Sequence, residues 1–463
     1  MCAVTVGAAV AAVDWGQQEQ ARLQSHAQQL FGVGSALTQS SSQQVTQEQA
    51  EADPTSLVTL AAGLKARVVT VGQAPNVLDM IALWPNDSHP QWLVECNETD
   101  DTSEPGLVRI NVATGDVATI VTGTSDCDPV RRTGWGAIVF GEEAGGGSSG
   151  GALYELLDPV GTTNVVLDRT TGTFSGGTGS ENLVARPAVG RLSFEGLALY
   201  PNGVLYYGDE NRPASGSPGG GYFKFVPSDP SDGTSIDSLA DSPLVSGSIY
   251  GLRLGLRSNG TDYGQGTETG FGKWIPICSG ATCSNIDLRA QTASLKLTGY
   301  YRPEDAEVDA AALAATRVRF CGNNTGNESN DQMWGETICV TDGTLEQATA
   351  GTAVPEVQRL VQGRPALAMP DNLAFQPGRH NLVIHEDADT TYLSPHNDDL
   401  WDCLPDGGDD DLQSDGCIRI ATLNDLTAEW TGGIFDATGK RFFVSVQHNI
   451  SGFGVVLEIT GWK

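Results

Sequence analysis

Acidic side chains stand at the ends of short apolar segments throughout this sequence. Phe194-Glu195-Gly196 begins one such segment, and Asp209-Glu210 ends the next one. A Pro-Asn-Gly turn joins the two segments, which predicts two adjoining strands with both acidic sets at one end of a sheet. Carboxylate oxygens are the ligands that hard cations such as calcium prefer. The fragment therefore predicts metal-binding groups that a pair of strands carries to a common edge.

Further candidate ligands of the same kind follow strand-like segments elsewhere in the chain. They are the pairs Asp126-Cys127 and Glu142-Glu143, the runs Arg302-Pro303-Glu304-Asp305 and Pro370-Asp371-Asn372, and Glu429. Carboxylates that meet at one place repel each other unless cations bind between them or some are protonated. A thiolate beside them, as Cys127 would provide, suits iron better than calcium. The alternative for Cys127 is a structural or disulfide-bonded cysteine.

Arg302 is the cation nearest to these acidic runs in the sequence. One interpretation is a bidentate grip on a phosphate oxygen. The alternative is a structural salt bridge to Asp305 or Glu307.

The formal net charge of −31 bears on the kind of partner. With so few basic residues, we expect no nucleic-acid partner. We interpret the many carboxylates as a solvated acidic coat, as a set of cation sites, or as both. No stretch approaches the roughly 20 apolar residues of a membrane span. Residues 1–13 are mildly apolar and read at most as the remnant of a signal peptide.

Nine cysteines suggest an oxidising compartment. Three pairs lie close in the sequence: Cys278 with Cys283, Cys321 with Cys339, and Cys403 with Cys417. Cys2, Cys96 and Cys127 are left over. The last pair would close the acidic run 406–411, for which we favour a solvated loop over a bound ion because the EF-hand spacing is absent.

About twenty short apolar or β-branched segments alternate with turn residues from residue 55 onwards, which favours an all-β architecture. Four windows repeat one pattern of strand, turn, strand and polar exit: 134–143, 197–210, 373–387 and 433–448. A repeated hairpin that cannot bury its own face indicates a β-propeller with decorated loops. We expect residues 1–50 to be a leader remnant and a short helical arm with a linker, and residues 55–463 to be one propeller domain.

Seven motifs resemble, in order, those of the PhoX family of alkaline phosphatases. They are Cys127 with Trp135-Gly136 and Glu142-Glu143, FEG at 194–196, YYGDE at 206–210, YFKFVP at 222–227, RPEDAEVD at 302–309, PDNLAF at 370–375 and GIFDATGKRFFVSVQH at 433–448. The resemblance covers the chain from about residue 66 to the C-terminus. Two stretches depart from the family pattern: 95–98, where members tend to have Asn-His-Glu, and 130–132, where they are Gly-rich.

The resemblance implies a six-bladed propeller with iron and calcium at one end of its channel. It further implies a periplasmic or secreted enzyme that hydrolyses small phosphomonoesters, with Fe³⁺ (two ions) and several Ca²⁺ as cofactors. We expect the protein to be a monomer. By motif match, Arg302 and Glu304 are the catalytic candidates, and Arg302 also binds substrate. The metal candidates by the same match are Cys127, Glu142, Glu195, Glu304, Asp209, Asp371, Asn372 and Glu429. Two alternatives stay open, a calcium-stabilised propeller that only binds a partner and a calcium-dependent propeller lactonase or esterase.

Overall fold

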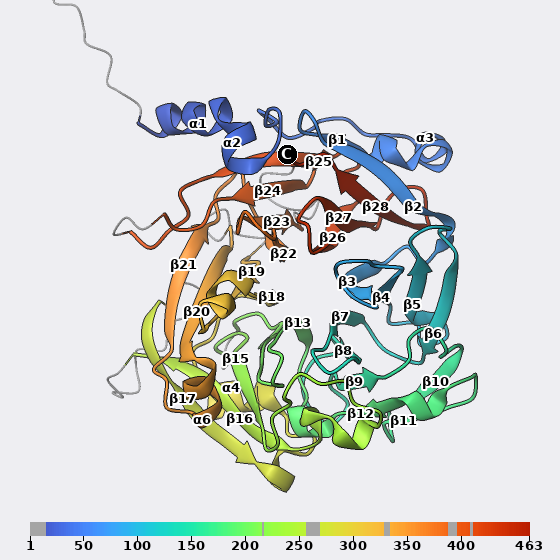
Figure 1. Cartoon of the computed structure of the whole chain (residues 1–463), viewed down its shortest axis with the longest axis vertical. Coiled ribbons are helices and arrows are strands. Elements are labelled where there is room, and N and C mark those ends of the chain that lie inside the picture. Colours follow the sequence, from blue (N-terminus) through green and yellow to red (C-terminus); the bar gives the residue numbers. More distant parts are fainter. Residues whose placement is uncertain (1–14, 215–216, 256–268, 328–333, 388–395, 408–410) are drawn as a thin grey trace, which may run out of the picture.

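The strands of this protein form a ring of blades around a common centre (Figure 1). The computed structural model describes residues 15–214, 217–255, 269–327, 334–387, 396–407 and 411–463. Its strands make five sheets, and the nine-stranded sheet consists of two successive antiparallel meanders joined edge to edge through β17 and β21. The described strands therefore form six blades, which confirms the predicted all-β propeller.

The first three blades follow each other along the chain. Blade 1 contains β3 (Leu78–Trp84), β4 (Trp92–Asn97), β5 (Pro105–Asn111), β6 (Val117–Thr122), β10 (Val165–Asp168) and β11 (Thr173–Ser175). Blade 2 contains β7 (Cys127–Arg132), β8 (Ile138–Glu142), β9 (Leu153–Leu156) and β12 (Leu183–Ala185). Blade 3 contains β13 (Phe194–Leu199), β14 (Leu205–Asp209), β15 (Tyr222–Pro227), β16 (Gly247–Leu254) and the long edge strand β17 (Gly270–Ser279).

The other three blades complete the ring. Blade 4 contains β18 (Pro303–Val308), β19 (Arg317–Asn324), β20 (Glu336–Thr344) and β21 (Glu356–Gln362). Blade 5 contains β22 (Pro370–Phe375), β23 (Leu382–Glu386), β24 (Asp399–Cys403), β25 (Cys417–Leu423) and β1 (Val58–Leu60). Blade 6 contains β26 (Glu429–Phe435), β27 (Arg441–Gln447), β28 (Gly454–Thr460) and β2 (Lys65–Ala74).

The ring is closed by pairing the first long strand with the last one. β2 lies antiparallel to β28, with Ala66 opposite Ile459, and Figure 1 shows the blue strand beside the red one. Blade 6 therefore contains both the beginning and the end of the propeller, so a single sheet links the two ends of the ring. The six innermost strands are β3, β7, β13, β18, β22 and β26, one from each blade.

The blades are held together by side chains on both of their faces. β14 and β15 are buried along their whole length, because each blade packs between two others. Tyr206 of blade 3 stacks on Phe320 of blade 4, with ring centroids 4.7 Å apart. This two-sided burial explains why the repeated hairpins read as nearly continuous apolar runs in the sequence.

The predicted helical arm lies across the edge of blade 5. It comprises the helices α1 (Trp15–Ser25), α2 (Ala27–Phe31) and α3 (Gln47–Ala52). Phe31 and Val33 are fully buried, and Leu37 bridges to Arg419 of β25. The remaining helices are α4 (Leu288–Ser294), α5 (Ala310–Ala314) and α6 (Leu345–Ala350). No helix among the described residues is long and apolar enough to span a bilayer.

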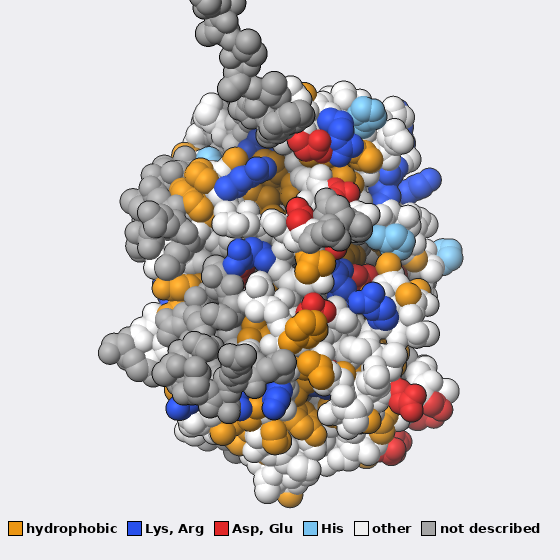
Figure 2. All heavy atoms as spheres, turned by 90° about the vertical axis from the view of Figure 1, so that its left-hand side faces the viewer, with side chains coloured by type: hydrophobic (Ala, Val, Ile, Leu, Met, Phe, Trp, Pro, Cys, Tyr) orange, Lys and Arg blue, Asp and Glu red, His pale blue; other side chains and the backbone are white. Residues whose placement is uncertain are grey.

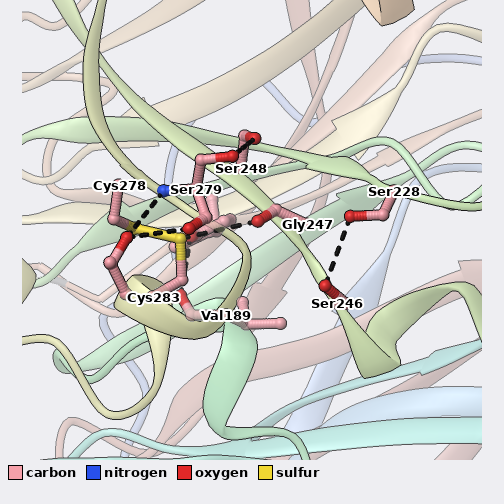
Figure 3. The surroundings of a disulfide bond; sticks show 10 residues. Val189, Ser228, Ser246, Gly247, Ser248, Cys278, Ser279 and Cys283 are labelled. Carbon is pink, nitrogen blue, oxygen red and sulfur yellow. Dashed lines mark hydrogen bonds between the residues drawn. A yellow bond between two sulfur atoms is a disulfide. The ribbon is translucent and has the colours of Figure 1, made fainter.

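Four disulfide bonds join cysteines within the described residues. The three expected pairs are confirmed: Cys278–Cys283, Cys321–Cys339 and Cys403–Cys417. Figure 3 shows the first of them, where Cys283 also approaches the carbonyl oxygen of Gly247. The fourth bond joins Cys96 to Cys127, which the spacing did not indicate.

Figure 2 shows the face beside β20 and β21, where basic, acidic and apolar side chains are interspersed over the described part. Two expectations cannot be placed on the structure: the leader remnant at 1–13 and the centre of the acidic run, 408–410, lie outside the described residues.

Candidate metal centre

Five of the six innermost strands carry a carboxylate in a β-bulge at the same place. In β3, for example, Leu78 pairs with Asn97 and Ile81 pairs with Glu95, so two residues of β3 lie opposite one residue of β4. A bulge of this kind re-aims a side chain that would otherwise follow the alternation of the strand. The first residue of each bulge is acidic, and we call these residues the bulge acids: Asp79, Asp128, Glu195, Glu304 and Asp371.

A second set of side chains comes from the next strand of each blade. Asn97, the last residue of β4, pairs with Leu78 of β3. The residue after it, Glu98, therefore lies at the same end of the blade as Asp79. The corresponding residues of blades 2, 3 and 5 are also acidic, whereas blade 4 has Thr325 there. We call the acidic members the post-strand acids: Glu98, Glu143, Glu210 and Asp387.

Blade 6 departs from this pattern. Its bulge contains Gly432 and Gly433, both at positive φ (+74° and +73°). A Cβ on Gly433 would meet the His385 ring at 1.9 Å, so a side chain is excluded there. Blade 6 instead extends two residues further and brings Glu429 and His448 to the same end of the ring, with 3.3 Å between the His448 Nε2 and Glu429 Oε1 atoms.

All of these acidic groups except Glu210 line a cavity of about 420 Å³ at one end of the ring. Ten carboxylates and two arginines are among its lining residues. They are Asp79, Glu98, Asp128, Glu143, Glu195, Glu304, Asp371, Asp387, Asp398 and Glu429, with Arg212 and Arg302. The remaining lining comes from Met369, the segment 426–428 and His448. So many carboxylates in one cavity require cations or protons to compensate their charge.

Three overlapping triplets of these carboxylates have the geometry of cation sites. They are Asp79–Glu98–Asp128, Asp128–Glu143–Glu195 and Glu195–Glu304–Asp371. Within each triplet, one oxygen from each residue lies within 4.8 Å of the others. Asp128 and Glu195 each belong to two triplets, so they would bridge neighbouring ions. The structure thus supports a connected row of oxygen-lined sites along blades 1 to 5.

The protonation of these carboxyls reflects their burial. Burial raises the pKa of Asp79, Asp128, Glu195 and Asp371 well above the usual carboxyl range, and neighbouring carboxylates raise it further. The pKa of Glu304 rises to about 7, because burial outweighs the opposing effect of Arg302. In the absence of cations the cavity therefore holds part of its charge as bound protons.

Arg302 is held over this cavity by three carboxylates. Its Nε atom lies 2.8 Å from Glu210 Oε1 and 3.3 Å from Glu304 Oε1, and its Nη1 lies 3.8 Å from Asp387 Oδ2. Burial disfavours the charged form, but Glu304 and Glu210 outweigh it and raise the pKa of Arg302 well above its usual value. Its backbone is in the left-handed region, with φ +50°. Such strain in a non-glycine residue is common at functional sites.

The structure brings five of the predicted site residues together. Glu195, Glu304, Asp371, Glu429 and Arg302 all line the cavity. The expected alternative for Arg302, a salt bridge to Asp305 or Glu307, is not what the structure shows. Asp305 instead pairs with Arg131 at 2.6 Å.

Three other predicted metal ligands lie behind the cavity lining. Glu142 pairs with Arg169 at 2.8 Å and also accepts hydrogen bonds from the Ser125 amide and the Tyr154 hydroxyl. Asp209 is held by Arg289 at 2.7 Å. The Asn372 amide oxygen, the atom that would bind a cation, accepts a hydrogen bond from the Gly432 amide at 3.1 Å. These side chains support the cavity wall.

The prediction of an iron-binding thiolate at Cys127 is corrected by the structure. Its sulfur atom is bonded to Cys96, which is also fully buried. Cysteine binds a metal ion through its thiolate, and a disulfide sulfur carries no thiolate charge. Cys127 is therefore not available as a ligand while this bond is intact. The next residue, Asp128, is the one that reaches the cavity.

Several lining residues are absent from the predicted ligand set, above all Asp79, Glu98, Asp128, Asp387 and Asp398, and of the candidate pair Glu142-Glu143 the set took Glu142, whereas Glu143 lines the cavity. Glu143 and Asp128 each directly follow a residue that was chosen. The missing signal was the bulge, because strict alternation assigns the wrong one of two adjacent residues to the cavity. Asp79 lies between apolar neighbours, which gave no sign of an acidic cluster.

One further group, Glu386, His396 and Asp399, lies close enough together to suggest a cation site. The Glu386 oxygens already accept hydrogen bonds from the Ala368 and Asp399 amides and from the Trp401 indole, and one of them lies 3.0 Å from His396 Nε2. Glu386 ends β23 opposite Pro370, as Glu142 ends β8 opposite Cys127. We therefore interpret this group as structural.

A known protein of solved structure shares this architecture. Among solved structures, Pseudomonas fluorescens PhoX in complex with vanadate, a transition state analogue, aligns with a TM-score of 0.64 at 14% identity, over 93% of this chain and 98% of that one. The PQQ-bound aldose sugar dehydrogenase of Streptomyces coelicolor aligns with a TM-score of 0.44 at 12% identity, over 87% and 99%. No curated protein sequence matches the chain. The family model of the alkaline phosphatase PhoX matches residues 178–449, more than half of the sequence, and the chain therefore belongs to the PhoX alkaline phosphatase family.

Proposed function

We propose that this protein is a metal-dependent phosphomonoesterase that acts outside the cytoplasm, as a monomer, on small organic phosphate esters. The observation that carries the proposal is the row of three carboxylate triplets beside Arg302 in one cavity. Family membership supports the reaction class. Four disulfide bonds support an oxidising compartment.

The residues present fit hard cations. The Oδ1 atoms of Asp79 and Asp128 are buried and have no hydrogen-bond partner among the described residues. A buried carboxylate oxygen without a partner is costly unless a cation or proton satisfies it. All the donors in the three triplets are oxygens, which suits calcium. Ferric iron also accepts oxygen donors, so two ferric ions and several calcium ions remain our proposed cofactor set, held by carboxylates without a thiolate.

Bound cations would reverse the sign of the local potential, polarise the phosphoryl oxygens and lower the pKa of a bound water. Without such cations, the acidic cavity would repel a phosphate ester, which is a dianion at alkaline pH. The triplets that share Asp128 and Glu195 would hold the cations in a connected row. The buried carboxylates would thus hold the cofactor in place.

Arg302 places a positively charged guanidinium group beside the carboxylate triplets. Glu210 and Glu304 fix its guanidinium group at 2.8 Å and 3.3 Å, which limits its rotation before substrate arrives. A planar guanidinium can donate two parallel hydrogen bonds to a phosphoryl group and stabilise the charge on its equatorial oxygens. The Thr325 hydroxyl donates to Glu304 Oε1 at 2.7 Å and so keeps this carboxylate beside Arg302.

The decisive experiment measures hydrolysis of 4-nitrophenyl phosphate together with metal content. We expect activity to disappear on chelation and in Glu304→Ala, because Glu304 belongs to a triplet and also orients Arg302. Glu181→Ala, which removes an exposed carboxylate outside the cavity lining, is the matched control. Full activity in Glu304→Ala would overturn the site assignment. A protein that binds calcium yet hydrolyses no phosphomonoester would favour the non-catalytic propeller.

A further inference from the structure

Three apolar side chains belong to the cavity lining, in contrast to its acidic remainder. They are Met369, Leu426 and Ala428, with Thr427 between the last two. Met369 and Ala428 are 1% and 5% exposed, whereas Leu426 is 42% exposed. Leu426 is therefore the apolar side chain with the most area to offer a ligand at this edge of the cavity. Neither a cation nor a phosphoryl group gains anything from such a side chain.

The N-terminal arm holds Leu426 in place by its backbone. The Gln44 side chain donates from Nε2 to Asp425 Oδ1 at 2.9 Å and accepts, at Oε1, the amide of Leu426 at 2.8 Å. Both bonds come from one side chain, so Gln44 clamps two consecutive residues of the segment. This interaction links the N-terminal arm to the edge of the cavity.

Further bonds fix the two residues that precede Leu426. Asp425 is fully buried, and its Oδ2 accepts the amide of Ile450 at 2.6 Å. The Asn424 carbonyl accepts the amide of Val45 at 2.8 Å. An exposed leucine on a fixed backbone is a preorganised contact, because little conformational entropy is lost when a ligand packs against it.

The size and charge of the cavity limit what could lie against Leu426. A volume of about 420 Å³ is within the range typical of small-molecule sites, and a phosphoryl group would fill only part of it. The carboxylates of Asp398 and Glu429 belong to the same lining and would repel an anionic organic group. The carboxylates thus disfavour an anionic organic group, and the exposed Leu426 side chain offers an apolar contact to a neutral one.

On the basis of the proposed function, we propose that Leu426 is a specificity-determining residue that contacts the organic group of the phosphomonoester, and that the chain favours esters whose organic group is apolar or aromatic. The phosphoryl group would lie towards Arg302, and the organic group would pack on Leu426 at the edge of the cavity. Gln44 is then a positioning residue that acts through the backbone of Leu426.

The test compares two phosphomonoesters on the metal-loaded enzyme: 1-naphthyl phosphate, with an aromatic organic group, and glycerol 2-phosphate, with a polar one. For Leu426→Ala we expect kcat/KM for the naphthyl ester to fall by roughly 3- to 10-fold, through KM, because an apolar contact is lost from the bound state. The value for the glycerol ester should stay within about twofold. Gln44→Ala should shift the same ratio in the same direction, by less.

Matched variants separate this effect from a general loss of structure. Leu412→Ala removes a leucine of similar exposure, 44%, outside the cavity lining, and Gln43→Ala removes the neighbouring glutamine of the arm. Neither should change the ratio of the two kcat/KM values. An equal fall for both esters in Leu426→Ala, or no change for either, would overturn the proposal while leaving the phosphatase function intact. A wild-type enzyme that hydrolyses neither ester would overturn the proposed function and this inference with it.

Discussion

Glu142 and Glu143 are adjacent in the sequence, yet they serve opposite sides of the cavity wall. Glu142 is not among the lining residues and pairs with Arg169 at 2.8 Å. Glu143 lines the cavity and forms a triplet with Asp128 and Glu195. The same division recurs in blade 3, where Asp209 pairs with Arg289 and the next residue, Glu210, pairs with Arg302. In each pair the first residue supports the wall, whereas the second either lines the cavity, as Glu143 does, or holds Arg302, as Glu210 does.

The two glutamates of blade 2 should respond in opposite ways to the same substitution. Glu142→Gln should keep the metal content but lower the free energy of unfolding by about 1–3 kcal/mol, because Arg169 loses its charged partner. Glu143→Gln should lower the metal content. It should also stabilise the metal-free protein at pH 8, because burial and Glu98 raise the pKa of Glu143 and so disfavour its charge.

Metal analysis and thermal unfolding with and without chelator check both variants. Glu181→Gln, an exposed glutamate outside the cavity lining, is the control for the substitution itself. Loss of metal from Glu142→Gln, with full retention in Glu143→Gln, would reverse the assignment of the two residues.

The contrast within these pairs shows how far the sequence could lead. The apolar hairpins at 197–210, 373–387 and 433–448 predicted propeller blades, and each window is the inner pair of strands in its blade. The sequence could not reveal the bulges. In each bulge, the side chain that enters the cavity is one residue away from the one that strict alternation would choose. Glu195 and Asp371 were found because they stand inside recognisable motifs. Asp128 was missed in favour of its neighbour Cys127.

Long-range pairing was the other limit. Cysteine pairs separated by 5, 14 and 18 residues were predicted from their proximity in the sequence. The Cys96–Cys127 bond spans 31 residues and joins neighbouring blades, so only the fold brings its sulfur atoms together. The contact of Gln44 with Leu426 likewise depends on an arm that crosses the edge of blade 5.

The Cys96–Cys127 bond leads to a prediction about the cofactor. The double variant Cys96→Ser/Cys127→Ser should retain its metal content, because neither sulfur atom is a free ligand. Its free energy of unfolding should fall by roughly 2–4 kcal/mol, since a cross-link between blades 1 and 2 is lost. Elemental analysis and chemical denaturation measure the two effects. Selective loss of iron with unchanged stability would instead identify Cys127 as a metal ligand.

Removal of the cations should make stability depend on pH. The buried carboxyls of the cavity have raised pKa values in the folded protein, about 7 for Glu304 and well above the usual range for Asp79, Asp128, Glu195 and Asp371. The folded state then binds protons more tightly than the unfolded chain, so their stabilising effect is complete below the unfolded carboxyl pKa of about 4 and is lost as pH rises through the folded values. We expect the Tm of the metal-free protein to fall between pH 5 and pH 9 by more than that of the metal-loaded protein.

Differential scanning fluorimetry across this pH range, with and without chelator, measures the difference. The metal-loaded protein is the control, because in it cations instead of protons compensate the negative charge of the carboxylates. Parallel Tm profiles for the two forms would mean that these carboxylates do not hold the cations.

Catalytic activity should depend on the planar shape of the Arg302 side chain as well as on its charge. Arg302→Lys keeps the positive charge beside Glu210 and Glu304 but loses the planar pair of donors that matches a phosphoryl group. We expect kcat/KM for 4-nitrophenyl phosphate to fall by about 100-fold, the usual cost of removing one donor to a transition-state oxygen. Inhibition by vanadate should weaken in parallel, because a transition-state analogue uses the same donors.

Metal content should stay unchanged, since the three triplets contain no arginine. Arg359→Lys, which alters an arginine paired with Glu336 outside the cavity lining, is the matched control. If Arg302→Lys retained full activity and vanadate sensitivity, Arg302 would act only as a counter-charge for the surrounding carboxylates.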